Sequence, residues 1–279
     1  MIIVQPLEFT LGSIKITGFG LTMALAFMTG AWIMEREVRR LRYSADFIGD
    51  IVLGAVVGGI VGAKLWYVAL YGIETLTSRS GLVFYGGFLG GVLGVILMGW
   101  VKRVPIRWTM HLVAPALAAA YAVGRVGCFV VGDDYGRPTD LPWAVAFPNG
   151  SPPSLAGVMA RQFGTVFPEG TDPMTLVAVH PTQLYEVIIM LVVFAVLWRW
   201  RTAARGTGWL FGAYLVFAGA ERFAVEILRA KDDRFLGPLT LAQATGLLSI
   251  VVGAVLWSRL AAAETVDPGP YLSRGKGNK

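Results

Sequence analysis

The segment Gly124–Asp140 combines residue types that suit the binding of a charged ligand. Arg125 stands at the end of a long apolar run, and three glycines and two carboxylates follow within twelve residues. A guanidinium in hydrocarbon is costly, so such an arginine usually faces a polar cavity and serves a function. The glycines allow backbone to approach a ligand closely. We therefore expect an anion-binding site around Arg125.

A second charged group lies further along the chain, where Arg222, Glu226 and Arg229 are spaced to share one helical face. Two interpretations remain open. Arg222 and Glu226 can neutralise each other and simply join helices. Alternatively, Arg222 and Arg125 point into one cavity with few buried acids beside them and bind an anion. Phosphate suits the guanidinium fork, and a lipid phosphate is the most abundant anion at that depth.

The segment His180–Glu186 opens another apolar run. Thr182 can cap the expected helix, and Glu186 either stabilises its positive N-terminal end or belongs to the site. Cys128, one turn after Arg125, is interpreted as a small buried residue and not as a nucleophile. The single cysteine and two histidines form no ligand set, so we expect no metal.

The composition indicates which elements must position these residues. The 279-residue chain is 55% hydrophobic and 15% charged, whereas a soluble protein carries about 25% charged residues. We predict an all-α polytopic membrane protein, because seven apolar segments approach the ~20 residues that a crossing requires. The segments are Ile16–Met34, Phe47–Leu70, Leu82–Trp100, Trp108–Val131, Gln183–Trp200, Gly208–Leu228 and Leu239–Trp257.

The basic residues predict the orientation. Lys and Arg gather in alternate loops, around residues 36–42, 102–107 and 199–205, and in the tail. The positive-inside rule then places the N-terminus outside and the C-terminus in the cytoplasm. Basic cytoplasmic loops also explain the net charge of +6 without a nucleic-acid partner. We expect a membrane domain over residues 1–263 and a cytoplasmic tail at 264–279.

The membrane domain is expected to carry an external insertion. Residues 132–181 are too long for a simple turn, and their proline, glycine and aromatic content favours an ordered cap. The stretch Trp143–Phe147 alternates as a short strand would. We therefore predict a small external loop domain over the membrane.

Glycines at helical spacing predict close packing between neighbouring helices. Gly54, Gly58 and Gly62 recur every four residues on one face. Gly87 and Gly91 recur similarly within Tyr85–Gly91. For this second set, helix packing and room for a ligand headgroup both remain open.

Several of these motifs together resemble the signature of bacterial prolipoprotein diacylglyceryl transferases. The resemblance rests on Gly124–Trp143, on His180–Glu186, on Arg222–Arg229 and on Tyr85-Gly86-Gly87. Their order, their spacing and the seven-span layout agree over nearly the whole chain. The sequence departs from the usual family pattern at six positions: Tyr85 stands where many members have histidine, Cys128 and Val131 replace asparagines, Asp133 replaces glutamate, and Phe19 and Ala218 replace tyrosines.

The resemblance implies a multi-pass enzyme of the bacterial inner membrane. It would transfer the diacylglyceryl group of phosphatidylglycerol to the lipobox cysteine of a preprolipoprotein, forming a thioether and releasing glycerol phosphate. No cofactor is expected. The alternative is a lipid-binding or transport protein of the membrane without transferase chemistry, and a third possibility is a structural membrane protein with internally paired charges.

Within this hypothesis the candidate residues take distinct roles. Arg125 and Arg222 grip the lipid phosphate, and Arg137 assists from the external rim. The thiol proton goes to Asp133, Glu226 or Tyr85, or to the departing phosphate, and the sequence does not rank these. Further substrate contacts are expected from Gly86, Gly87, Gly136 and Tyr185.

Overall fold

A computed structural model describes residues 2–11, 14–78, 81, 83–230 and 234–267. The start of the third apolar segment, Leu82, and most of the expected tail, 268–279, lie outside the described residues. Within the described ranges, seven long helices form the body of the protein: α1 Gly18–Arg40, α2 Asp46–Tyr71, α3 Phe84–Val101, α4 Ile106–Val131, α6 Thr182–Trp200, α7 Trp209–Glu226 and α8 Leu241–Ala261.

Short elements complete the described chain. They are the 3-10 helix Ile73–Thr77, the helix α5 Ala156–Phe163 and short strands that form two-stranded sheets. The strands are β1 Ile2–Ile3, β2 Glu8–Leu11, β3 Ile14–Thr17, β4 Val145–Ala146, β5 Arg234–Leu236 and β6 Leu239–Thr240. The sheets join β1 to β4 in parallel, and β2 to β3 and β5 to β6 as antiparallel pairs.

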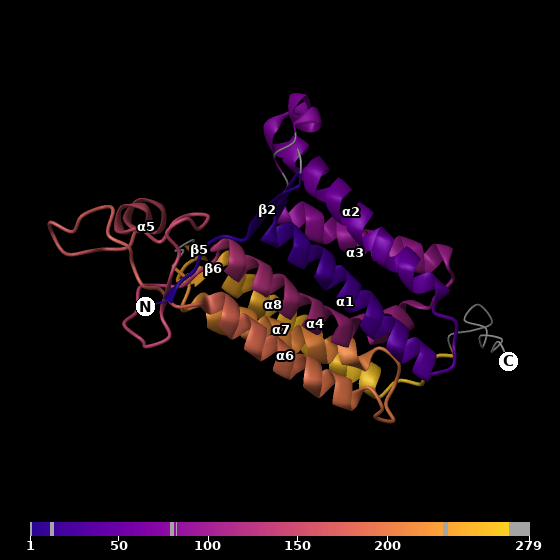
Figure 1. Cartoon of the computed structure of the whole chain (residues 1–279). Helices are drawn as coiled ribbons and strands as arrows, with labels where there is room; N and C mark the ends of the chain where they lie inside the picture. The colour runs from indigo at the N-terminus through magenta and orange to yellow at the C-terminus, as the bar shows by residue number, and fades with distance from the viewer. Residues whose placement is uncertain (1, 12–13, 79–80, 82, 231–233, 268–279) are drawn as a thin grey trace.

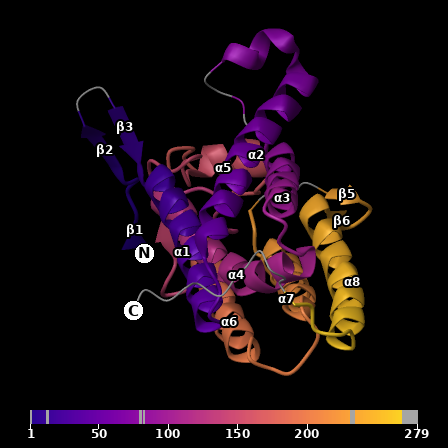
Figure 2. The ribbon, with the colours of Figure 1, turned by 90° about the vertical axis from the view of Figure 1, so that its right-hand side faces the viewer.

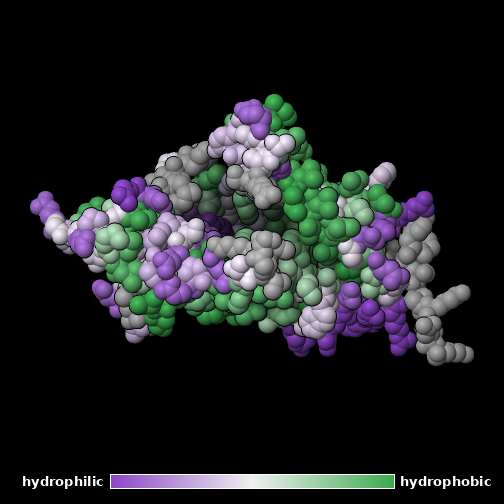
Figure 3. Space-filling model, turned by 45° about the horizontal axis from the view of Figure 1, so that its top comes forward, coloured by the Kyte–Doolittle hydropathy of each residue, from purple (hydrophilic) through white to green (hydrophobic). Residues whose placement is uncertain are grey.

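The prediction of a polytopic helical membrane protein is confirmed. In the described residues, six helices are long and apolar enough to cross a membrane: α1, α2, α3, α4, α6 and α8. Large apolar side chains such as Leu93 and Leu248 are exposed on them, as is typical of helices that face lipid. Figure 3 shows the apolar residues in a band between polar ends. The helix α7 is different, because it carries Glu221, Arg222 and Glu226 within eighteen residues.

The helix α1 ends later than the apolar segment predicts, because its last turns contain a buried ion pair. The helix α1 continues six residues beyond the predicted Met34, to Arg40. Its Glu37 is buried and accepts hydrogen bonds from Arg40 Nη2 at 2.6 Å and from Arg201 Nε, after α6, at 2.9 Å. A neutralised carboxylate can be buried, but hydropathy counts it as polar.

The helix α4 is central and packs against α1, α6 and α7. Its many alanines let these neighbours approach closely, and Ala114, Ala118 and Ala122 are buried against α6 and α7. The helix α8 packs on α7 at one side (Figure 2). The helices α2 and α3 form a hairpin that packs mainly against itself and leans away from the bundle (Figure 1).

Glycine contacts hold this hairpin together, as the helix-packing interpretation predicts. A Cβ on Gly58 would lie 2.3 Å from the carbonyl oxygen of Gly90, and one on Gly90 would lie 2.2 Å from that of Gly58. Gly62 has the same relation to Gly86, at 2.3 Å. The two backbones therefore touch, and only glycine fits at these positions.

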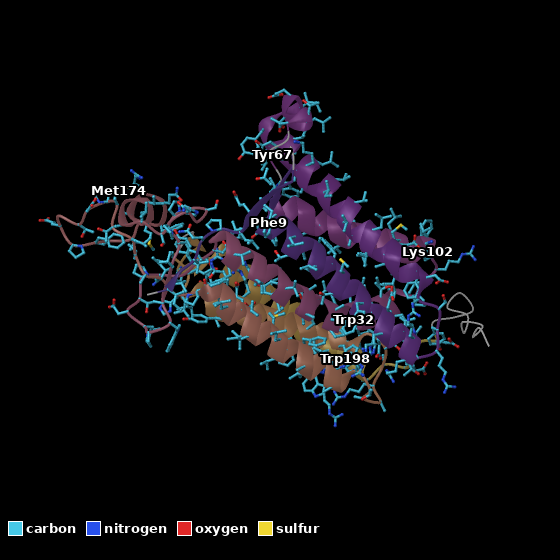
Figure 4. All side chains as sticks on the ribbon, viewed as in Figure 1. Phe9, Trp32, Tyr67, Lys102, Met174 and Trp198 are labelled. Atoms are coloured by element: carbon cyan, nitrogen blue, oxygen red, sulfur yellow. The ribbon has the colours of Figure 1, made fainter. Side chains whose placement is uncertain are left out.

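Residues 132–181 fold over one end of the bundle. The predicted strand is present as β4, which pairs with β1 near the N-terminus. Tyr135, Phe147 and Met159 are buried together in a small core of their own. Figure 4 shows Met174 at this end, which we call the cap end, while Trp32, Lys102 and Trp198 lie toward the opposite end.

The hairpin contact yields a stability prediction. Replacing Gly58 by alanine should force α2 and α3 apart and destabilise the protein by about 1–3 kcal/mol, as overpacking usually does. The measurement is the midpoint of thermal unfolding in detergent micelles.

The matched control is Gly59→Ala, on the same helix one residue away. A Cβ there would meet only the carbonyl oxygen of Gly87, at 3.6 Å, which is an ordinary contact. This variant should unfold at or above the wild-type temperature. Equal losses in both variants would contradict the backbone contact.

Candidate active site

Arg125 lies at the cap end of α4 and is held by three elements. Its Nη1 donates to Asp134 Oδ2 at 2.9 Å, in the segment after α4. Its Nε lies 2.9 Å from Glu186 Oε2, on α6. Its Nε and Nη2 also donate to the hydroxyl of Tyr121, one turn earlier on α4. The guanidinium is thus fixed in one orientation.

Glu186 connects the two arginines that the sequence analysis singled out. Its side chain is 1% exposed. One oxygen faces Arg125, and the other, Oε1, lies 3.6 Å from Nη1 of Arg222 on α7. Oε1 also accepts a hydrogen bond from Tyr121 at 3.2 Å. The structure therefore brings Arg125 and Arg222 to opposite sides of one buried carboxylate.

The charges continue from Arg222 and close into a ring. Arg222 Nη2 lies 2.8 Å from Glu226 Oε2, and the same oxygen lies 3.8 Å from Nε of Arg229. Arg229 Nη2 donates to Asp134 Oδ1, whose partner oxygen binds Arg125. We call the six residues the ion ring; in order they are Arg125, Asp134, Arg229, Glu226, Arg222 and Glu186.

This geometry corrects one expectation about the arginines. The sequence analysis expected few buried acids beside Arg125 and Arg222, and on that ground a need for an external anion. The ion ring instead supplies three carboxylates for three guanidinium groups. The pairing of Arg222 with Glu226 is present, and it lies within the same cluster as Arg125. Neutrality therefore does not require a ligand.

Several ring contacts are close in distance but lack hydrogen-bond geometry. Arg222 Nη1 and Arg229 Nε are buried and donate no hydrogen bond within the described structure. Arg222 is also 27% exposed, compared with 14% for Arg125, whose nitrogens all have acceptors. Buried donors without acceptors are costly. Arg222 is thus the ring arginine best placed to bind an added anion.

The beginning of α6 fixes the backbone of the two aspartates. Thr182 does not cap the helix; its hydroxyl donates to the carbonyl oxygen of Asp134 at 2.8 Å. Gln183 Nε2 donates to the carbonyl oxygen of Asp133. The two side chains thus hold the chain that leaves α4 against α6, which places Asp134 between Arg125 and Arg229.

The neighbouring aspartates have opposite electrostatic environments. Burial alone would raise the pKa of Asp134, but the charges and hydrogen bonds of Arg229 and Arg125 lower it to about 2. Burial raises the pKa of Asp133, and the negative charge of Asp134 adds to that effect. Asp133 makes no ion pair among the described residues, and its Oδ1 is buried without a hydrogen bond. Only Asp134 is therefore held firmly as a carboxylate.

The remaining predicted site residues lie outside the ring. Tyr85 is 39% exposed on α3 and packs edge-on against Phe84. A Cβ on Gly86 would clash with Trp66 Cβ at 2.4 Å, so helix packing explains this glycine, whereas Gly87 has only ordinary contacts at 3.4 Å or more.

The motif residues of the cap end also contact protein. A Cβ on Gly136 would lie 2.6 Å from the carbonyl oxygen of Leu228, so the close approach there is to the chain itself. Arg137 is exposed, and its Nε donates to the carbonyl oxygen of Arg229. Tyr185 accepts a hydrogen bond from Trp143 Nε1 at 2.8 Å and borders an apolar pocket of about 420 Å³.

One group of side chains has the spacing of metal ligands. The donor atoms of Cys128, Asp133 and Asp134 lie within 4.8 Å of one another. However, Arg125 Nη1 lies 3.5 Å from Cys128 Sγ, and both oxygens of Asp134 already bind arginines. The positive charge beside these atoms opposes a divalent cation, so the group does not fit a metal site.

Two members of the site were missed by the sequence analysis. Tyr121 could have been found, because it precedes Arg125 by four residues and therefore shares its helical face. Asp134 had no distinguishing signal beside Asp133. Glu221, on α7, is also buried, at 4% exposed, and forms no ion pair in the described part of the chain.

Comparison with known proteins gives a consistent result. The prolipoprotein diacylglyceryl transferase family matches residues 6–259. The chain is 29% identical over 263 residues to the phosphatidylglycerol–prolipoprotein diacylglyceryl transferase of Clostridium tetani, covering 91% of this chain and 97% of that one. It is 32% identical to the protein of that name from Trichormus variabilis, covering 89% and 86%. It is 31% identical to the protein of the same name from Xanthomonas oryzae pv. oryzae, and the match covers 95% of this chain and 94% of that one.

The two aspartates are predicted to have opposite effects on the stability of the fold. Because the folded-state pKa of Asp134 lies below that of an unfolded aspartate, about 3.9, ionised Asp134 stabilises the fold above about pH 4. This stabilisation is lost as the pH falls to about 2. The raised pKa of Asp133 means that its ionised form destabilises the fold.

We therefore expect Asp134→Asn to lower the free energy of unfolding at pH 7 by about 1–2 kcal/mol, allowing for solvent screening of a partly exposed side chain. Asp133→Asn should raise it. Thermal unfolding in detergent at pH 7 and pH 3 checks both, and a shift of the same sign for the two variants at pH 7 would contradict the assignment.

Proposed function

Since the chain belongs to the prolipoprotein diacylglyceryl transferase family, we propose that it transfers the diacylglyceryl group of phosphatidylglycerol to the lipobox cysteine of preprolipoproteins. The sulfur forms a thioether with the glyceryl carbon, and glycerol phosphate leaves. The names of the relatives state both the lipid donor, phosphatidylglycerol, and the protein acceptor, a prolipoprotein. We further propose the bacterial inner membrane as the location.

The observation that carries this proposal is the joint contact of Arg125 and Arg222 with the buried Glu186. Two guanidinium groups on either side of one carboxylate mark a position where an anionic oxygen is stabilised. A phosphate oxygen has the charge and size to bind there. Arg222, with its unused Nη1 donor, would receive it first, and Arg125 would form the fixed wall of the site.

The reaction requires charge stabilisation where the phosphate departs. As the bond between the glyceryl carbon and the phosphate oxygen breaks, negative charge grows on the leaving phosphate. A guanidinium fixed before the reaction stabilises that charge more than it stabilises the bound lipid, and this difference lowers the barrier. Among the remaining candidates, Glu226 holds Arg222 and Arg229, so its proposed role is to position them. Arg137, Gly87 and Tyr185 remain proposed substrate contacts.

The orientation is part of the same proposal. The first strand lies at the cap end, through its pairing with β4. The chain after α8 lies at the other end, where Trp108 Nε1, at the start of α4, donates to the carbonyl oxygen of Val266. A chain whose two ends lie on opposite sides crosses the membrane an odd number of times. Six of the described helices qualify as spans by apolar length, so α7 is supported as the seventh. The basic loops at the opposite end support a cap on the outer side of the membrane.

The proposed function predicts that Arg125 and Arg222 are both needed for transfer. Arg125→Gln and Arg222→Gln should each lower transfer of labelled diacylglyceryl from phosphatidylglycerol to a lipobox peptide by about 10²–10³-fold, as the loss of a preorganised donor usually does. Arg161→Gln, an exposed arginine of the cap, is the matched control and should leave transfer unchanged.

A double variant excludes a purely structural role. Arg125→Gln leaves Glu186 short of a partner, and Arg125→Gln with Glu186→Gln restores neutrality. If Arg125 only balanced charge, the double variant would regain activity. We expect it to fold as wild type does and to stay inactive. Full activity in folded single variants would refute the phosphate-binding role.

The second prediction concerns orientation. Cysteines placed at Glu169, in the cap, and at Ala204, between α6 and α7, are both at exposed positions. A membrane-impermeant maleimide added to intact spheroplasts should label Glu169→Cys at once and Ala204→Cys only after permeabilisation. Wild type, whose Cys128 is buried, serves as the blank. Labelling of Ala204→Cys in intact spheroplasts would overturn the orientation.

A further inference from the structure

The proposed reaction needs a group that removes the proton from the acceptor thiol, because the thiolate and not the thiol is the competent nucleophile. The structure offers several acids near the ion ring. They differ in what their oxygens already contact, and this difference distinguishes them.

The acids of the ring are committed to arginines. Glu186 lies between Arg125 and Arg222, and Glu226 contacts Arg222 and Arg229 through a single oxygen. Asp134 binds an arginine through each oxygen. A carboxylate held in this way is a poor proton acceptor, because protonation would break its ion pairs.

Tyr85 and Glu221 are not placed for the role either. The ring of Tyr85 packs against Phe84 on the α2–α3 hairpin, and α3 makes few contacts with α4. Glu221 is buried inside the bundle, and it borders neither the pocket beside Tyr185 nor the one beside Asp133. An acceptor peptide would have to enter the helix core to reach it.

Asp133 borders a pocket, and among the described residues no arginine forms an ion pair with its carboxylate. It borders a pocket of about 240 Å³ whose other walls are Pro6–Glu8, Thr17, Phe19 and Val131. No ion pair holds Asp133 in the described chain, and its Oδ1 accepts no hydrogen bond there. The pocket lies where the N-terminal segment, the start of α1 and the end of α4 meet.

Asp133 is also close to the phosphate-binding arginine. Its carboxylate and that of Asp134 lie within 4.8 Å of Cys128 Sγ, and this sulfur lies 3.5 Å from Arg125 Nη1. The Cys128 sulfur thus lies close to both groups, and its thiol shares a hydrogen bond with the Asp133 side chain. Burial, which raises the pKa of Asp133, also makes it a stronger base than an exposed aspartate.

We propose that Asp133 is the general base of the transfer and that the acceptor cysteine reaches it through this pocket. The inference rests on the proposed function. The Asp133 carboxylate takes the proton of the S–H group, and the sulfur electron pair forms the bond to the glyceryl carbon. The bond from that carbon to the phosphate oxygen breaks, its electron pair leaves with glycerol phosphate, and the proton passes from Asp133 to water.

The test compares two acceptor peptides that differ in one atom. One lipobox peptide carries cysteine, and the other carries selenocysteine, whose selenol is already ionised at neutral pH. Asp133→Asn, Asp133→Glu and wild type are assayed with both peptides by mass spectrometry of the lipidated product. Asp140→Asn is the matched control, because Asp140 is an exposed aspartate of the same segment.

We expect Asp133→Asn to slow transfer to the cysteine peptide by about 10²-fold or more, the usual contribution of a general base. Transfer to the selenocysteine peptide should change little, since no proton has to be removed. Asp133→Glu should retain part of the cysteine activity, and Asp140→Asn should match wild type with both peptides.

Two results would overturn the assignment while leaving the proposed function intact. These are wild-type rates for Asp133→Asn, and equal losses with both peptides, which would make Asp133 a positioning residue. If wild type itself lipidates neither peptide, the proposed function fails and the base assignment fails with it.

Discussion

The buried carboxylate of Glu186 is the contact on which the rest of the site depends. It lies on α6 and bridges Arg125 of α4 and Arg222 of α7. A lone charge at this depth would be very unfavourable, and so would either arginine without it. The three helices are therefore joined at the cap end by charges that none of them could bury alone. Asp134 and Glu226 extend the same principle to Arg229.

Two kinds of contact hold the helices together, and they occur in different parts of the molecule. Charges join α4, α6 and α7, where the site lies. Backbone contact between glycines joins α2 and α3, and this hairpin touches the other helices only sparingly. The hairpin is thus a rigid unit beside the site and not part of its charged centre. Tyr85 and Gly86, despite lying in a motif of the resemblance, belong to this unit.

Much of the fold could be predicted because it follows from the length of the apolar segments. The long helices largely coincide with the apolar segments. The Gly54–Gly62 repeat predicted close packing with a neighbouring helix, which the structure shows to be α3. Hydropathy failed at α1, whose last turns contain the ion-paired Glu37. The site was predicted in part. Arg125 and Arg222 were identified as costly charges. A local pattern cannot show that these two arginines, far apart in sequence, meet at Glu186, or that Asp134 and not its neighbour Asp133 pairs with Arg125.

The equal number of acids and arginines in the ring has a consequence for turnover. A phosphate that binds at the unused Nη1 donor of Arg222, as proposed, would share that guanidinium with Glu186 and Glu226, so these two acids would compete with the ligand. Such competition weakens the affinity for the lipid donor. It weakens the affinity for the released glycerol phosphate as well, because Glu186 and Glu226 can pair with Arg222 again when that product moves. On the proposed function, the ring would thereby limit product inhibition and help the site to empty after each cycle.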